Sequence, residues 1–308
     1  MHPKGIALLK DAGHQVDTEF IAQEELTSRL NEYDAILVRS ATKVRKELMD
    51  QAPNLKLIGR GGVGLDNIDV DYAKEKGIPV YNTPAASTRS VAELTMAHLF
   101  GIVRSLPMLN KKMAQDGVSD FKQLKKTASK GIELEGKTLG LIGFGRIAKE
   151  TASIALGAGM KIMAYDPYIS EGDVSLHLHS DYDFNYTINV KTTSKEEVLS
   201  QSDFISLHIP GGQGYVLETA EFELMKQGVG IVNCARGGTI CEESLISAVH
   251  TGKVTYVATD VFESEPPIDD RLLRIDQVGL SPHIGASTQE AQERVGLQLA
   301  QQVIDFFS

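Results

Sequence analysis

The sequence predicts an α/β protein made of two parallel-sheet domains, one inserted into the other. Three observations lead to this class. Short apolar runs alternate with helical stretches along almost the whole chain, which is the rhythm of βαβ units. Two glycine-rich turns, GRGGVG at 59–64 and GFGRIA at 143–148, each follow one of these runs. A length of 308 residues is sufficient for two domains that each bury their own core.

The first series of elements occupies the N-terminal third. Strands are expected at three apolar runs and helices between them: strands at 33–40, 55–60 and 78–82, helices at 44–52 and 69–77. A long helix should follow over 87–113, with Ser87 and Thr88 available to cap its start. Pro107 is expected to bend or break this helix. The polar stretch 116–136 has weak periodicity and suggests a surface excursion.

A second alternating series fills the rest of the chain. Six strands are expected, at 138–143, 161–166, 203–210, 230–236, 256–262 and 277–283. Helical patterns follow at 146–159, 242–252 and 288–307, the last strongly apolar on one face. The stretch 169–200 mixes short β-like pieces with charge, so an irregular or locally variable connection is expected there.

These two series give two Rossmann-like domains. The first consists of 1–83 and 285–308, and the second, inserted domain covers 84–284. Chain crossings near Pro84 and Gly285 would form a hinge, and a cleft between the domains is the usual place for a small-molecule site.

Composition excludes several classes of function. The formal net charge is −10, and no run of five basic residues occurs, so a nucleic-acid partner is not expected. No apolar run approaches 18 residues, and the N-terminus lacks the pattern of a signal peptide, so a soluble cytoplasmic protein without a membrane partner is expected. Cys234 and Cys241 lack CxxC spacing, which argues against a disulfide framework and against a metal site.

The two glycine turns differ in context. GFGRIA has a strand before it, a helix opening on it and Asp166 at the end of the next strand, as a dinucleotide-binding turn requires. Gly143 would permit the tight turn, Gly145 would let the backbone approach a pyrophosphate, and Ala148 is small enough for helix–strand contact. Asp166 would bind the adenosine ribose and repel a 2′-phosphate, which favours NAD over NADP.

GRGGVG lacks that context, because LDNID separates it from the next helix and Asn82 ends the following strand. It is either a flexible turn or a set of exposed amides that could bind a small carboxylate.

Three residues near the ends of late strands could converge on a ligand: Arg236, Glu265 and His283. Removal of a hydride from an alcohol carbon needs a base for the hydroxyl proton, and an imidazole suits this near neutral pH. A carboxylate on the other ring nitrogen would fix the tautomer, and a guanidinium would hold a substrate carboxylate. Each residue alone has an ordinary structural explanation: a surface ion pair, a solvated acid or a capped polar residue.

Together, VNCARGG, DVFESEPP and SPHIGAST after a Rossmann turn resemble the D-isomer-specific 2-hydroxyacid dehydrogenases. The likeness covers nearly the whole chain. VRSAT (38–42), GRGGVGLDNID (59–69) and NCARGG (233–238) are most similar to the phosphoglycerate dehydrogenase branch. The resemblance implies an NAD-dependent dehydrogenase in which Arg236 holds the substrate carboxylate, His283 is the acid–base and Glu265 orients it.

The resemblance also implies the other contacts. The cofactor-binding residues would be Val63, Gly143, Gly145, Arg146, Ile147, Asp166, Ile209, Pro210, Cys234, Ala235, Arg236, Asp260, His283, Gly285 and Ala286. The substrate, a phosphorylated 2-hydroxy acid, would be bound by Arg39, Ser40, Val63, Gly64, Arg236 and His283, with Arg39 as the candidate for the phosphate. A homodimer would form through the 87–113 helix region.

Two alternatives remain at this point. The same triad serves glyoxylate and hydroxypyruvate reductases, so the reaction type is better defined than the substrate. Some members of the family are NAD-sensing dimeric corepressors, although those usually carry partner-binding extensions. The resemblance further implies a strand before residue 3, where this sequence starts with a helical pattern. It also leads us to expect no regulation through an additional C-terminal domain.

Overall fold

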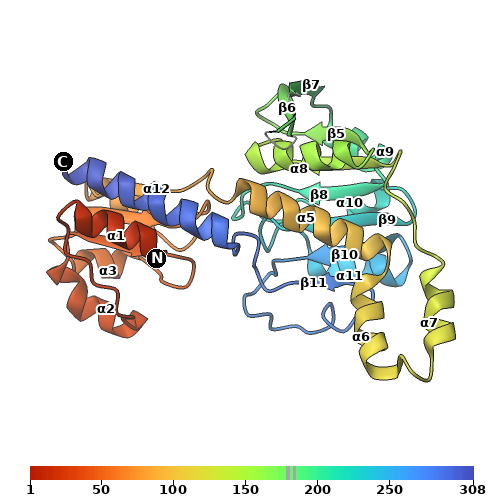
Figure 1. Ribbon diagram of the computed structural model, residues 1–308, viewed down its shortest axis with the longest axis horizontal. Helices are drawn as coiled ribbons and strands as arrows, with labels where there is room; N and C mark the ends of the chain where they lie inside the picture. Colours follow the sequence, from red (N-terminus) through yellow and green to blue (C-terminus); the bar gives the residue numbers. More distant parts are fainter. Residues whose placement is uncertain (178–180, 183–184) are drawn as a thin grey trace. The chain divides into compact units, whose positions relative to one another are not determined.

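The computed structural model describes residues 1–177, 181–182 and 185–308. The chain divides into two compact units, 1–90 with 286–308, and 91–285. The boundaries therefore lie at Ser90 and Gly285, where the sequence suggested 83 and 284. Each unit contains a parallel sheet with helices on both faces (Figure 1). The predicted α/β class with Rossmann-like sheets is confirmed.

The first unit is built on a three-stranded sheet. Its strands are β1 (Ala35–Val38), β2 (Leu57–Arg60) and β3 (Val80–Asn82), parallel and adjacent in that order. Helices α1 (Pro3–Asp11) and α12 (Gln289–Phe307) cover one face. The other face is covered by α2 (Gln23–Arg29), the 3-10 turn η1 (Leu30–Glu32), α3 (Lys46–Asp50) and α4 (Val70–Glu75). Alternate strand residues enter each core, as the two-residue period of a strand requires.

The larger unit contains six parallel strands. They are β4 (Thr138–Ile142), β5 (Lys161–Tyr165), β8 (Phe204–Leu207), β9 (Val229–Asn233), β10 (Val254–Thr259) and β11 (Gly279–Leu280). The strand order is β11-β10-β9-β8-β4-β5. The chain leaves β4 toward one edge of the sheet and later returns to continue toward the other. The point between β4 and β8 is therefore the topological switch where α/β sheets bind ligands.

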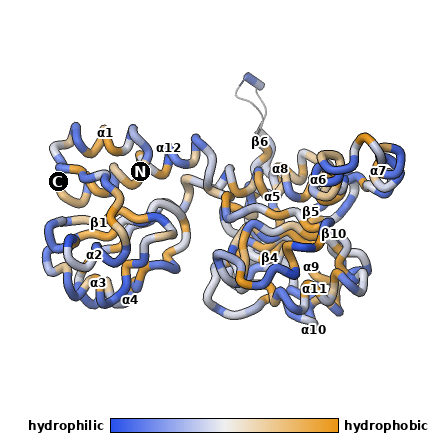
Figure 2. The backbone as a smooth tube through the Cα atoms, turned by 90° about the horizontal axis from the view of Figure 1, so that it is seen from below, coloured by the Kyte–Doolittle hydropathy of each residue, from blue (hydrophilic) through white to orange (hydrophobic). Residues whose placement is uncertain are grey.

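Two helical layers enclose this sheet. Helices α5 (Thr88–Val103) and α8 (Arg146–Gly157) share one core with residues of β4, β8, β9 and β10. Helices α9 (Lys195–Gln201), α10 (Thr219–Leu224) and α11 (Glu242–His250) share the other. The apolar colour of the strands in Figure 2 reflects their burial on both faces, which is typical of parallel sheets.

The helix expected over 87–113 is broken, as Pro107 predicted. Helix α5 ends at Val103, Ser105 has a left-handed φ of 54°, and α6 (Leu106–Asp116) begins with the proline in its first turn. Within the polar stretch 116–136, residues 121–128 form helix α7 (Phe121–Ala128).

The expectation of an irregular connection over 169–200 is wrong for most of the described residues there. Strands β6 (Glu171–His177) and β7 (Asn185–Lys191) form an antiparallel hairpin, and α9 follows. Val174 is fully buried in the core that includes α8, and Ser153 of α8 donates to the Ser175 carbonyl at 2.6 Å. One face of the hairpin is thus packed, although the outward residues are polar. Residues 178–180 and 183–184 lie outside the described part.

Among the helices of the described ranges, none combines the length and the hydrophobicity needed to span a bilayer.

Candidate active site

The predicted site residues of the larger unit lie in the loops, or in the first turn of the helix, that follow its strands. Because all six strands are parallel, the loops after their carboxyl ends lie along the same edge. Each strand is followed by at least one of them: Gly143, Gly145, Arg146 and Ile147 after β4, Asp166 after β5, Ile209 and Pro210 after β8, Cys234, Ala235 and Arg236 after β9, Asp260 and Glu265 after β10, and His283 and Gly285 after β11.

The glycine turn after β4 has the geometry of a dinucleotide-binding turn. Gly143 has φ +90°, and a Cβ on it would lie 2.6 Å from the carbonyl oxygen of His208. A Cβ on Gly145 would meet nothing within 4 Å, so this backbone faces open space at the start of α8. Uncovered amides at a helix N-terminus suit a phosphate, and the turn therefore fits the pyrophosphate of a dinucleotide.

Asp166 is tied to the same turn. Its Oδ2 accepts a hydrogen bond from the Phe144 amide at 2.8 Å, and its Oδ1 accepts from the amides of Tyr168 and Ile169. These bonds hold the carboxylate beside the glycine turn. A carboxylate has about four acceptor positions, so a hydroxyl of a ribose could still be accommodated. Ribose binding by Asp166 stays a prediction.

His283 and Glu265 form a pair. Nδ1 of His283 lies 2.6 Å from Oε2 of Glu265, and Oε1 of the same carboxylate accepts from the Phe262 amide at 3.3 Å. Both side chains remain partly accessible, 41% and 38% exposed. With Nδ1 engaged by the acid, Nε2 is the ring nitrogen that can exchange a proton with a substrate.

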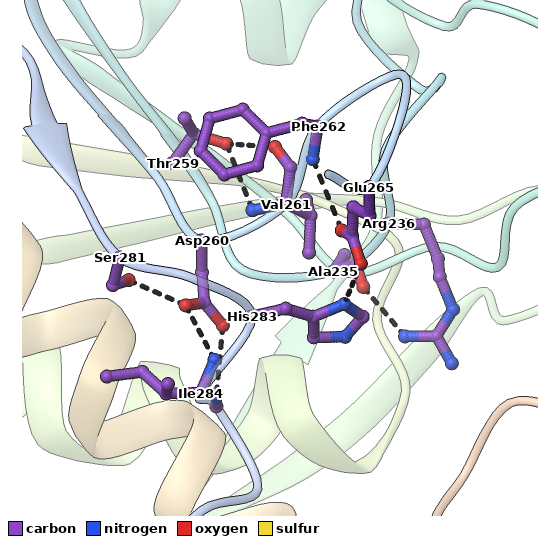
Figure 3. A network of polar contacts seen from close by, with 11 residues as sticks. Ala235, Arg236, Thr259, Asp260, Val261, Phe262, Glu265, Ser281, His283 and Ile284 are labelled. Atoms are coloured by element: carbon purple, nitrogen blue, oxygen red, sulfur yellow. Dashed lines mark hydrogen bonds and ion pairs between the residues drawn. The ribbon is translucent and has the colours of Figure 1, made fainter. Parts of the chain in front are cut away.

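Arg236 lies beside this pair in the view of Figure 3. Its Nη1 donates to the carbonyl of Ala235 at 2.7 Å, and Asn233 donates from Nδ2 to the carbonyl of Arg236 at 3.0 Å. The stem of the side chain lies against Gly211, where a Cβ would come within 3.4 Å. The three predicted catalytic side chains come from the loops after β9, β10 and β11, which are neighbouring parallel strands of one sheet.

Asp260 is fully buried and holds the His283 loop. Its Oδ1 accepts from Ser281 Oγ at 2.6 Å and from the Ile284 amide at 2.8 Å, while Oδ2 accepts from the Gly285 amide at 2.8 Å. Its carbonyl accepts from the His283 amide at 2.7 Å. A contact from Asp260 to the nicotinamide carboxamide stays a prediction.

Two further histidines of this unit were not among the predicted site residues. His98 on α5 contacts Ser281 at 2.8 Å, and burial lowers the pKa of its imidazole. Burial also lowers the pKa of His208 to about 3, and its Nε2 lies 3.0 Å from Ser206 Oγ. The sequence offered two indications of these contacts: His208 lies near the end of a predicted strand, and Ser281 lies within the motif SPHIGAST.

Cys234 follows β9 and is buried. Burial raises the pKa of its thiol to about 12, so the group is a neutral thiol near neutral pH. Its place among the strand-end loops fits a packing contact with a bound ring rather than nucleophilic chemistry.

The remaining predicted residues belong to the first unit. Arg39 and Ser40 directly follow β1 and are exposed, while Val63 and Gly64 lie in the loop after the adjacent β2. This loop is fixed by two bonds, from the Gly62 amide to Thr83 Oγ1 at 2.8 Å and from Asn82 Nδ2 to the Val63 carbonyl at 2.6 Å. Ala286 begins the second segment of this unit.

Comparison with known proteins places this site in a family. The model of the D-isomer specific 2-hydroxyacid dehydrogenase NAD binding domain matches residues 96–285, which is more than half of the chain. The chain belongs to the D-isomer-specific 2-hydroxyacid dehydrogenases. Its larger unit is therefore the NAD-binding part of a dehydrogenase, which agrees with the glycine turn after β4.

Relatives of this dehydrogenase carry two different names. A hydroxypyruvate reductase of Thermotoga maritima is 45% identical over 94% of this chain and 90% of its own length. A D-3-phosphoglycerate dehydrogenase of Methanocaldococcus jannaschii is 42% identical over 98% of this chain, which spans only 55% of that protein. The structure of an Entamoeba histolytica 3-phosphoglycerate dehydrogenase with bound NAD+ matches with a TM-score of 0.78 and 28% identity, covering 99% of this chain and 91% of that one.

Proposed function

We propose that this dehydrogenase oxidises D-3-phosphoglycerate to 3-phosphohydroxypyruvate with NAD, the first step of L-serine biosynthesis. The observation that carries the reaction type is the 2.6 Å pair between His283 and Glu265, beside Arg236, at the ligand-binding edge of an NAD-binding sheet. The phosphorylated substrate is supported by the likeness to D-3-phosphoglycerate dehydrogenases and by the exposed Arg39 next to the loop of Val63 and Gly64.

In the proposed mechanism the protein positions the substrate, a 2-hydroxy acid, and removes the proton of its hydroxyl group. Arg236 would bind the substrate carboxylate through its guanidinium. His283 Nε2 would take the hydroxyl proton as the hydride leaves the same carbon, and Glu265 would stabilise the imidazolium that forms. NAD, when bound, supplies the acceptor of that hydride. Gly143, Gly145 and the first turn of α8 would hold its pyrophosphate, and Asp166 its ribose.

A second candidate is reduction of hydroxypyruvate or glyoxylate at the same site. It is favoured by the 45% identity to a hydroxypyruvate reductase, a relative that this chain covers over 90% of its length. The two candidates share His283, Glu265 and Arg236 and differ in whether a phosphate is bound. They are therefore separated by substrate and not by chemistry.

A substrate panel tests the proposal. With NAD, D-3-phosphoglycerate should give a higher kcat/KM than D-glycerate or D-lactate. With NADH, the kcat/KM for phosphohydroxypyruvate should be higher than the values for hydroxypyruvate and glyoxylate. Equal or higher values for the unphosphorylated acids would reject the phosphoglycerate proposal in favour of the reductase. No turnover with any 2-hydroxy acid, with NADH still bound, would direct attention to a binding role.

We also propose that the dehydrogenase is a homodimer that forms through α5 and α6, the 87–113 helix region. These helices expose large apolar side chains: Phe100, Leu106 and Met113, between 44% and 55% accessible. Apolar side chains gathered on consecutive helices are typical of protein interfaces. The free cysteines Cys234 and Cys241 fit a reducing compartment, and we propose a cytoplasmic location.

A further inference from the structure

A histidine on α5 is linked to the loop that carries His283. Nε2 of His98 lies 2.8 Å from Ser281 Oγ, and this hydroxyl donates to Asp260 Oδ1 at 2.6 Å. The same carboxylate accepts the amides of Ile284 and Gly285, each at 2.8 Å (Figure 3). A continuous chain of hydrogen bonds therefore runs from helix α5 to the backbone on the C-terminal side of the candidate base.

The donors in this chain have only one consistent arrangement. A serine hydroxyl carries one proton, and here that proton is given to the Asp260 carboxylate. Ser281 must therefore accept from His98, which requires a proton on Nε2 of the imidazole. Burial is the main cause that lowers the pKa of His98, so the neutral ring with its proton on Nε2 is the form that fits. Each bond in such a chain polarises and strengthens the next.

The fold leaves a place for this ring. A Cβ on Gly279 of β11 would lie 3.3 Å from Nδ1 of His98, and it would also lie 3.1 Å from Ile102 Cγ2. The absence of a side chain at Gly279 thus lets the imidazole approach the strand that leads into the His283 loop. His98 and Ile102 are four residues apart and share one face of the helix.

The loop needs such restraint because His283 is held in an unfavourable backbone conformation. Its φ is +53°, in the left-handed region that side chains other than glycine seldom adopt. Strain of this kind persists only where the surrounding structure over-determines it. The bonds from Asp260 to Ile284 and Gly285, together with the His283 amide bond to the Asp260 carbonyl, supply that restraint.

We propose that His98 and Ser281 are positioning residues for hydride transfer: His98 fixes the Ser281 hydroxyl, which fixes the Asp260 carboxylate and thereby the backbone that presents His283. The expected effect of His98 and Ser281 on turnover rests on the proposed function of His283 as the base. Their expected effect on the loop that carries His283 does not, because it can be measured without substrate.

Kinetics of three variants test the effect on turnover. H98L replaces the imidazole with an apolar side chain of similar size and so removes the hydrogen-bond donor. We expect kcat to fall about 10-fold while KM and NADH affinity change little, because a small displacement of His283 alters the geometry of the reacting groups. H98Q restores an amide donor and should recover most of the lost kcat. The control I102A removes side-chain atoms one turn further along the same face; it should lower the Tm but leave kcat near that of the wild type.

Hydrogen exchange tests the loop independently of activity. The amides of Ile284 and Gly285 should exchange faster in H98L than in the wild type, and at nearly wild-type rates in H98Q and I102A. If the wild-type protein oxidises no 2-hydroxy acid, the proposed function fails while this measurement still decides the positioning role. Unchanged exchange in H98L, equal loss of kcat in I102A, or no recovery in H98Q would each overturn the inference.

Discussion

At the residue scale, the charge of Glu265 should do more than orient His283, because a carboxylate also stabilises the imidazolium that forms when His283 takes a proton. In E265Q the amide could still accept a hydrogen bond from His283 Nδ1, but it could not stabilise the imidazolium. We expect kcat to fall about 100-fold, in the range of general acid–base contributions, with NADH affinity retained. Steady-state kinetics and NADH fluorescence titration measure the two quantities. Wild-type kcat in E265Q would remove Glu265 from the mechanism.

His208 gives a prediction on stability and pH. Its pKa is about 3 in the folded protein and near 6.5 when unfolded, so between these values the unfolded chain binds the extra proton. The stability contribution is complete above the unfolded pKa and is lost as pH falls, by about 1.4 kcal/mol per pH unit.

Urea unfolding from pH about 6.5 down to about 5 measures this slope before most carboxylates titrate. H208Q keeps a group that can bond Ser206 and cannot be protonated, so its unfolding free energy should fall less steeply than that of the wild type. His98, whose pKa is also lowered by burial, is present in both proteins and cancels in the comparison. Equal slopes would contradict the buried, neutral state of His208.

Arg39 gives a prediction on substrate choice. If its guanidinium binds the phosphate, R39A should raise KM for D-3-phosphoglycerate about 10- to 100-fold, the loss expected for one or more charge-assisted hydrogen bonds. The KM for D-glycerate, which has no phosphate, should change little and serves as the internal control. Equal increases for both acids would instead assign Arg39 to the carboxylate.

The residues that were predictable from sequence share one property. Arg236 and His283 end predicted strands and Glu265 lies in the loop after one, and parallel strands bring their carboxyl ends to one edge of the sheet without further information. His98 and Ser281 are 183 residues apart, and their contact depends on how α5 packs against β11. A single histidine within a mostly apolar helical pattern gives no sign of that packing, so this part of the site could not have been predicted.

At the element scale, two glycines in the turn after β4 should have different roles, one in the stability of the fold and the other in cofactor binding. Gly143 combines φ +90° with a Cβ position 2.6 Å from the His208 carbonyl oxygen, so G143A should cost about 1–3 kcal/mol of stability. Gly145 has φ −77° and open space around it, so G145A should leave the Tm unchanged. Its added methyl should nevertheless lower NADH affinity about 10-fold, because the pyrophosphate would approach that backbone.

Thermal unfolding and NADH titration of both variants check this pair. A low Tm in G145A would mean that the open space is needed by the fold, and unchanged NADH affinity would place the pyrophosphate elsewhere.

The elements that sequence predicted well are those whose signal is local. Apolar runs marked all six strands of the larger sheet, and Pro107 marked the end of the long helix. The hairpin β6–β7 was missed because its burial is one-sided. Val174 is buried in a core that includes α8, but the intervening positions Asp173 and Ser175 are exposed and polar. The sequence of a strand with such charged and polar positions resembles that of a loop until its packing partner is known.

At the scale of the whole molecule, each unit has its own sheet covered on both faces, which explains why the alternating pattern indicated two domains. The N-terminal segment and α12 lie at opposite ends of the sequence yet share the core of the first unit. A Cβ on Gly5 of α1 would lie 2.4 Å from the Gly296 carbonyl oxygen of α12, so two glycines allow this close helix contact. The motifs suggested the discontinuous unit, but only the structure gives this contact.

The proposed dimer is the prediction that belongs to this scale. Phe100 on α5 and Leu106 on α6 are 45% and 55% exposed, and burying them against a second copy would remove apolar surface from water. Sedimentation should give a dimer for the wild type. The double variant F100E/L106E should be a monomer, because it places charges in the contact at a desolvation cost.

L224E is the matched control, since Leu224 on α10 is 48% exposed in the same unit but lies outside helices α5 to α7. It should sediment as the wild type does. A monomeric wild type would reject the dimer, and a dimeric F100E/L106E would move the contact away from α5 and α6. A monomeric L224E would place it on the opposite helical layer, because α10 packs in the core of α9 and α11 and not in that of α5.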